Sequence, residues 1–157
     1  TPYVELPQQY RQLNHVARRL TDANNHAMLY HQAWRQPLAA TGQVDWLELK
    51  ADTQATDRHT LEGRIGLRLG KFLHIHTEVM LTQFQQANQY RPADVSPLAS
   101  IQQMNNSSAH LAIQYPLQEQ RKIRSNELHY FDHPEFAMLV KVIPFEPGLA
   151  AAPDVKE

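Results

Sequence analysis

The chain has 157 residues, and its 15 Lys and Arg residues nearly balance its 16 Asp and Glu residues, which leaves a formal net charge of -1. This length favours a single domain, and the near-neutral charge excludes general nucleic-acid coating, because non-specific binding of a polyanion needs a positive field. The absence of cysteine excludes disulfides, thiolate catalysis and cysteine-based zinc sites.

The first predicted element is an amphipathic helix over residues 7–23, which Pro7 suits as a first-turn residue. Its apolar residues recur at spacings of three and four on one helical face: Leu6, Tyr10, Leu13, Val16, Ala17 and Leu20. The following residues 27–36 alternate in character and stop at Pro37, which predicts a strand.

The middle of the chain is dominated by a β pattern. Residues 43–50 fit either a short strand or one helical turn. From Ile65 to Leu81 the apolar residues take odd positions, and the charged residues and histidines take mostly even ones. A two-residue hairpin turn would switch this parity, so the pattern favours one long strand bent at Gly70, with a three-residue turn there as the alternative. Residues 84–108 are rich in Gln, Asn, Ser and Pro and predict a long surface loop.

The parity of the apolar residues changes in the C-terminal part. They take odd positions over residues 111–117, whereas Leu128 and Tyr130 take even ones. A two-residue turn at Ser125-Asn126 produces this change, and Asn tolerates the left-handed conformation that such turns require.

These elements predict an α+β fold. Turn-forming residues at 132–135 and a β-rich stretch at 136–145 complete a C-terminal meander. We expect an antiparallel sheet of long bent strands to pack against the helix at 7–23, because the helix stripe and the alternating strands each need a buried partner. The single domain is expected to span residues 1–145, and residues 146–157 to form a flexible tail.

The densest polar cluster lies between Arg121 and Pro134. In the predicted hairpin Arg121 faces Tyr130 and Ile123 faces Leu128, so cationic, aromatic and imidazole groups converge. Guanidinium groups bind carboxylates in bidentate fashion, and aromatic faces stack on sugar rings. A site for carboxylates and sugar hydroxyls is therefore predicted from Arg121, Arg124, His129, Tyr130 and His133. The alternative is a solvated hairpin with ordinary cross-strand pairs.

Trp34 and Arg35 form a second candidate for ligand binding. A Trp beside an Arg at the end of a strand can be an exposed platform for a sugar ring. The alternative is that Trp34 anchors the core or the edge of the sheet.

The nine histidines raise the question of a metal site. His74 and His76 share one face of a strand, and His129 with His133 or Glu127 could complete a zinc site. Nothing in the sequence specifies the third ligand, and two solvated histidines are the alternative. We therefore expect neither a metal nor a cofactor.

No enzyme motif is present. Residues 66–72 resemble a phosphate-binding loop only loosely, because one intervening residue is missing and the segment alternates like a strand. The chain lacks a Gly-x-Ser-x-Gly elbow, a recognisable pair of catalytic carboxylates and an RNA-binding aromatic motif. Its apolar run at 136–140 is far shorter than the roughly 18 residues of a spanning helix, so no membrane span is expected.

The chain resembles the CsiV family of periplasmic peptidoglycan-binding proteins, which assist cell-wall synthesis in Gram-negative bacteria. The resemblance lies in HQAWRQP at 31–37, in GKFLH at 70–74, and most distinctively in 121–134 followed by FAMLV at 136–140. It spans most of residues 7–145.

The resemblance implies a non-enzymatic role in the periplasm. It implies binding to peptidoglycan and support of the outer-membrane lipoprotein LpoA, which activates a bifunctional class A penicillin-binding protein. It also implies that this chain is a C-terminal fragment of a longer precursor. Two alternatives remain: a structural protein-protein interaction domain that does not bind the wall, and a metal-dependent hydrolase.

Overall fold

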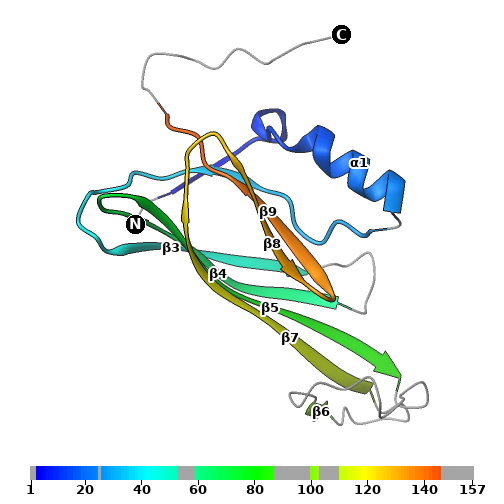
Figure 1. Cartoon of the computed structure of the whole chain (residues 1–157). Coiled ribbons are helices and arrows are strands. Elements are labelled where there is room, and N and C mark those ends of the chain that lie inside the picture. Colours follow the sequence, from blue (N-terminus) through cyan, green and yellow to red (C-terminus); the bar gives the residue numbers. More distant parts are fainter. Residues whose placement is uncertain (1–2, 25, 53–58, 87–99, 103–109, 146–157) are drawn as a thin grey trace.

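The structure is a computed structural model that describes residues 3–24, 26–52, 59–86, 100–102 and 110–145. Its main element is a five-stranded antiparallel sheet with the strand order β3-β4-β5-β7-β6 (Figure 1). The strands are β3 (Val44–Asp52), β4 (His59–Leu69), β5 (Leu73–Gln86), β6 (Ser100–Gln102) and β7 (His110–Ile123). For residues 43–50 the strand alternative is therefore confirmed.

The sheet has two chemically different faces, because successive side chains of a strand point to opposite sides. The register keeps odd-numbered residues of β3, β4, β5 and β7 on one side, which we call the covered face, and even-numbered residues on the other, which we call the open face. The covered face supplies most of the core: Leu47, Leu49, Leu61, Ile65, Leu67, Ile75, Val79, Leu81, Leu117 and Ile123.

The chain reverses between β4 and β5 at residues 70–72, with Leu69 opposite Leu73. The predicted single bent strand is therefore wrong, and the three-residue turn given as the alternative is confirmed. A three-residue turn places residues four apart opposite one another, so it preserves parity. The alternation of apolar residues is consequently the same for a bent strand and for this hairpin.

Two small antiparallel sheets accompany the main one. β1 (Val4–Leu6) pairs with β2 (Ala33–Arg35), and β8 (Leu128–His133) pairs with β9 (Phe136–Lys141). The predicted strand at 27–36 is thus reduced to three residues, whereas the turn predicted at 132–135 is confirmed by His133 opposite Phe136.

The predicted pairing of β7 with β8 is wrong. Arg121 on β7 lies opposite Ile75 of β5, and Tyr130 on β8 lies opposite Leu139 of β9. Asn126 does adopt the left-handed conformation, with φ of 66°. It leads the chain into a separate layer, where its backbone N–H donates to the carbonyl oxygen of Val142 at 2.8 Å.

The hairpin β8–β9 covers the sheet on the side of the core. Phe131 is fully buried there, and Met138 and Val140 pack against the same cluster. The segment before β3 contributes further apolar contacts to the core: Leu29, Tyr30, Trp34 and Leu38. The core therefore lies between two β layers.

The expected packing of a helix on the sheet is also wrong. The helix α1 (Asn14–Asn24) follows a short 3-10 turn η1 (Gln8–Tyr10), and Arg11 between them is extended. α1 projects away from the sheet (Figure 1), and none of its described side chains packs against the core cluster. Leu20 stays 37% exposed. The covered face already has its partners in the hairpin β8–β9 and in the segment before β3, so the fold is mostly antiparallel β.

Other predictions fall partly outside the described residues. Within the predicted loop at 84–108, β5 continues to Gln86 and β6 is a strand, and the remainder is not described. β9 ends at Lys141, and the predicted tail at 146–157 is not described. No helix in the described ranges has the length and apolar character needed to cross a membrane.

Candidate functional site

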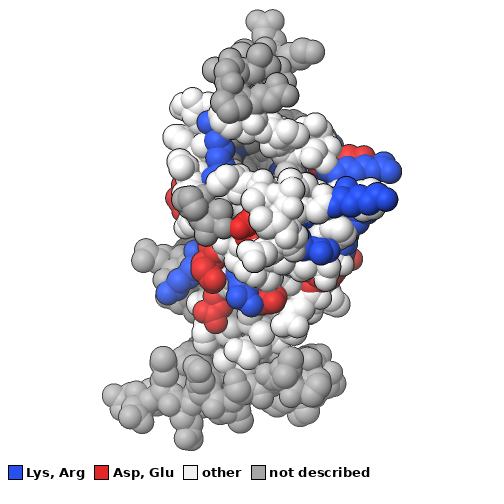
Figure 2. All heavy atoms as spheres, turned by 90° about the vertical axis from the view of Figure 1, so that its left-hand side faces the viewer, with Lys and Arg blue, Asp and Glu red and all other residues white. Residues whose placement is uncertain are grey.

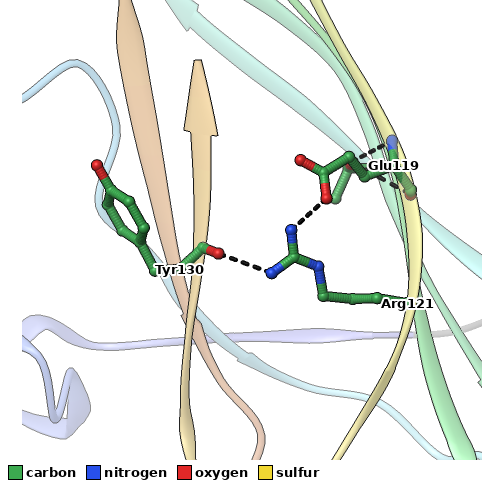
Figure 3. A network of polar contacts seen from close by, with 4 residues as sticks. Glu119, Arg121 and Tyr130 are labelled. Carbon is green, nitrogen blue, oxygen red and sulfur yellow. Dashed lines mark hydrogen bonds and ion pairs between the residues drawn. The ribbon is translucent and has the colours of Figure 1, made fainter. Parts of the chain in front are cut away.

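Arg121 connects the covered face to the hairpin β8–β9 (Figure 3). Its Nη1 donates to the carbonyl oxygen of Tyr130 at 2.8 Å, and its Nη2 pairs with the carboxylate of Glu119. The guanidinium carbon lies 4.1 Å from the centre of the buried Phe131 ring. Glu119 is held in turn, because its backbone N–H donates to Thr77 Oγ1 at 3.0 Å. The polar groups of Arg121 therefore serve mainly to hold two layers together.

His129 and His133 stabilise the two ends of β8. His129 Nε2 lies 3.0 Å from the carbonyl oxygen of Arg124. His133 Nδ1 accepts a hydrogen bond from the backbone N–H of Glu135 at 3.2 Å, and its ring lies 5.2 Å from that of Phe136. Both imidazoles are thus engaged in local contacts.

Tyr130 and Arg124 are accessible to a ligand. The Tyr130 side chain is turned away from Arg121 (Figure 3), and the residue is 51% exposed. Its hydroxyl donates to Asp132 Oδ1 at 2.9 Å, and this hydrogen bond raises the pKa of the phenol. Arg124 is 78% exposed and forms an ion pair of 3.5 Å with Glu127.

Trp34 and Arg35 point to different environments. Trp34 is half-buried against the core, and its indole N–H donates to Gln36 Oε1 at 2.6 Å. Trp34 therefore takes the anchoring position that the sequence left as the alternative. Arg35 is exposed, and its guanidinium carbon lies 3.9 Å from the centre of the Phe145 ring.

The seven predicted site residues do not form one surface. Five of them were grouped by a cross-strand register between β7 and β8, and these strands do not pair with each other. Trp34 and Arg35 were a separate candidate. Three of them remain exposed: Arg35, Arg124 and Tyr130.

The open face is a surface that the sequence analysis did not identify as a site. Strand register aligns its side chains in rows that cross the sheet from β3 to β7. The row nearest the β4–β5 turn, which we call the basic row, consists of Val44, Arg68, His74 and Lys122. The second row consists of Trp46, Gly66, His76 and Gln120. The third consists of Glu48, Arg64, Glu78 and Gln118.

The basic row contains no carboxylate. In the part of the chain that the structure describes, neither Arg68 nor Lys122 takes part in an ion pair. Lys122 Nζ lies 3.2 Å from the centre of the Phe72 ring, which is 43% exposed, and Lys71 Nζ lies 5.5 Å from the same ring. His74 Nδ1 lies 3.2 Å from the carbonyl oxygen of Phe72. Cations and an accessible aromatic ring therefore meet at this end of the sheet.

Trp46 occupies the second row by covering Gly66. A Cβ atom at Gly66 would come within 2.8 Å of a carbon of the Trp46 ring, so glycine leaves the space that the ring fills. The guanidinium carbon of Arg64 lies 4.3 Å from the ring centre, and His76 meets the ring at 6.0 Å in an edge-on arrangement. Burial, and then the charge of Arg68, lower the pKa of His76.

The third row is neutralised within the protein. Arg64 Nε donates to Glu78 Oε2 at 2.6 Å, and this hydrogen bond raises the pKa of Arg64. Beyond it lies a shallow depression of about 450 Å³, lined by Glu48, Leu49, Lys50, Glu62, Gly63 and Met80. Figure 2, which views the molecule from the left of Figure 1, shows a mostly uncharged surface, with basic side chains on both sides of the view and acidic side chains beside those at the lower left. Among these three rows, the cations that have no carboxylate partner in the described residues lie in the basic row.

The histidines of β5 do not form a metal centre with other described residues. Across the described ranges, no group of three or more His, Cys, Asp or Glu side chains is placed to hold a metal ion. His74 and His76 instead lie beside Arg68, as members of a cationic and aromatic surface.

Comparison with known proteins identifies one family. A family model described as "Peptidoglycan-binding protein, CsiV" matches residues 1–145. No curated protein and no solved structure gives a significant match to the chain. Because the matched region covers most of the sequence, and agrees with the resemblance seen in residues 121–134, the chain belongs to the CsiV family of peptidoglycan-binding proteins.

Proposed function

We propose that this protein is a non-enzymatic periplasmic accessory protein that binds peptidoglycan and supports LpoA-dependent activation of a class A penicillin-binding protein. Family membership supports binding to the wall. The observation that carries the proposal is the open face, on which unneutralised cations lie beside an exposed aromatic ring. Peptidoglycan is a long polymer with carboxylates and sugar rings, and an extended surface of this chemistry suits it.

An accessory role without catalysis is supported by the state of several carboxylates. Glu78, Glu119 and Glu127 each pair with an arginine. These ion pairs make the three carboxylates structural partners of the arginines.

Part of the two predicted sites is retained in this proposal. Arg124, Tyr130 and Arg35 are exposed and are proposed to contact the wall. The other four predicted residues contribute by holding the scaffold: Arg121, His129, His133 and Trp34.

One observation favours the alternative of an interaction domain that does not bind the wall. Apolar side chains are exposed on and after the C-terminal strands, namely Leu128, Ile143 and Phe145. Exposed apolar side chains are a feature of protein interaction sites. In our proposal such side chains dock the protein partner.

Cosedimentation with purified sacculi tests the proposal. We expect the protein to pellet with sacculi, to release no soluble muropeptides, and to bind purified LpoA in a separate pull-down. A folded protein that binds LpoA and stays in the supernatant with sacculi would favour the interaction domain. Release of muropeptides that stops with a chelator would favour the metal-dependent hydrolase.

A further inference from the structure

We propose that the basic row of the open face binds the free carboxylates of peptidoglycan peptide stems. Arg68 and Lys122 would form the charge-assisted contacts, with His74 between them on the neighbouring strand. This inference rests on the proposed binding to the wall, and it names the part of the polymer that is recognised and the side chains that recognise it.

The charge distribution across the rows supports an external anion at this position. Neighbouring strands are about 4.8 Å apart, so Arg68, His74 and Lys122 lie side by side. Arg68 on β4 and Lys122 on β7 are separated by His74 on β5, and no acidic side chain of the row lies between them, so a bound carboxylate can contact both cations. The third row differs, because the charge of Arg64 there is neutralised by Glu78 within the protein.

Unsatisfied polar atoms lie at the same place. Arg68 Nε and His76 Nε2 are buried and have no hydrogen-bond partner among the described residues. The two residues are diagonal neighbours on β4 and β5, since Arg68 lies opposite His74. Unpaired buried polar atoms are costly, and the oxygen atoms of a carboxylate are suitable acceptors for a guanidinium N–H.

The surroundings match a carboxylate that is attached to a sugar polymer. Phe72 lies at the turn above the row, with Lys122 on its ring, and part of the ring remains exposed for an apolar sugar face. Arg124 follows β7 directly and is highly exposed. Lys122 is exposed, and Arg68 and His74 are half-buried, so the end of a stem attached to a long glycan can reach the row from the side of Lys122.

The test uses the double variant Arg68→Gln/Lys122→Gln with a charge-matched control away from the open face, Arg19→Gln/Lys141→Gln. The control removes the same two positive charges from exposed positions outside the basic row. We expect the first variant to bind sacculi roughly 10-fold to 100-fold more weakly than the wild type, because two charge-assisted contacts are lost, and the control to bind within about twofold. Equal weakening of both variants would show that only net charge matters and would overturn the inference.

A second arm identifies the recognised group. Glycan strands stripped of their peptide stems by an amidase should bind the wild type as weakly as intact sacculi bind the double variant. Undiminished binding of the wild type to stripped strands would overturn the inference while leaving wall binding intact. Failure of the wild type to bind sacculi at all would instead overturn the proposed function.

Circular dichroism of each variant separates lost binding from lost folding. If the double variant does not fold, Lys122→Gln alone answers the question, because the exposed ammonium group contacts only the Phe72 ring among the described residues. We expect this single variant to bind sacculi about threefold to tenfold more weakly. Wild-type affinity in the folded single variant would overturn the inference.

Discussion

The covered and open faces of the central sheet carry the same kinds of side chain in opposite roles. Arg121 and Lys122 are neighbours in sequence, yet Arg121 is held by Glu119 and a carbonyl oxygen on the covered face, whereas Lys122 lies on the open face, where its ammonium group contacts the Phe72 ring. Because adjacent side chains of a strand point to opposite sides, a dense basic segment is divided between scaffold and surface. The partners of a charged group are therefore a better guide to its role than its sequence neighbours.

The largest difference in stability between a buried and an exposed substitution is expected within β8. Phe131→Ala should lower the free energy of unfolding by about 3–5 kcal/mol, because it empties a fully buried site between the two layers. Tyr130→Ala, which changes the exposed neighbour, should cost less than about 1 kcal/mol. Urea unfolding of both variants measures the difference, and similar losses would contradict the assignment of inner and outer sides to the hairpin.

Two glycines of the main sheet and its turn offer the next test. Gly63 has a φ of 139°, and a Cβ there would overlap the backbone of β5 at Glu78, so Gly63→Ala should destabilise the protein by at least about 2 kcal/mol. Gly70 lies at the exposed turn with nothing near its missing Cβ, so Gly70→Ala should change stability by less than about 0.5 kcal/mol. Thermal unfolding followed by circular dichroism compares them, and an equally tolerated Gly63→Ala would argue against the close approach of β4 and β5.

A smaller effect separates two arginines that the sequence placed in one site. Arg121→Ala should cost about 1–2 kcal/mol, since it removes a hydrogen bond and an ion pair between layers. Arg124→Ala should cost less than about 0.5 kcal/mol, because its ion pair is highly exposed. The midpoint of urea unfolding reports both values. The reverse order would mean that Arg121 does not hold the hairpin.

The smallest effect is the dependence of stability on pH. The pKa values of His76 and His31 are both lowered, mainly by burial, so the unfolded chain binds protons more readily at these groups. Their contribution is full above pH 6.5, the ordinary histidine pKa, and is lost as pH falls through the lower folded values. His76→Gln should therefore reduce the fall in unfolding free energy between neutral and mildly acidic pH. His15→Gln, at an exposed position on α1, is the matched control, and an unchanged slope in His76→Gln would contradict this assignment.

Local sequence signals predicted several parts of the fold correctly. Turn chemistry at 132–135 identified the connection between β8 and β9, and the left-handed conformation of Asn126 followed from its place between two β segments. Alternation from Ile65 to Leu81 identified the face of the core. These features depend on residues close in the chain, which is why the sequence was sufficient.

Features that depend on distant partners were not predictable in the same way. The apolar residues on one face of α1 indicated a helix. They did not indicate that the hairpin β8–β9, and not this helix, would pack on the covered face of the sheet. The odd-numbered positions of the apolar residues were equally compatible with a bend at Gly70 and with the observed turn. The helix also begins later than predicted, as Arg11 is extended and its Nη2 donates to Gln32 Oε1 at 2.6 Å, which ties the chain before α1 to a distant segment.

The candidate site shows the same limit. The hairpin site depended on a pairing of β7 with β8, whereas the basic row assembles Arg68, His74 and Lys122 from three strands whose order was not predicted. Trp46 lay in a segment that fitted either a strand or a helical turn. Its relation to Gly66 emerges only once β3 and β4 are paired.

The most direct test of the central claim uses the two tryptophans, one packed against the core and one on the open face. In Trp34→Phe, Trp46 is the sole fluorescent indole, and in Trp46→Phe only Trp34 remains. Each variant is titrated with soluble glycan strands that retain their peptide stems. If the open face binds the wall, the emission of Trp46 shifts and saturates with ligand while that of Trp34 stays constant. A saturable change confined to Trp34, with Trp46 silent, would contradict binding at the open face.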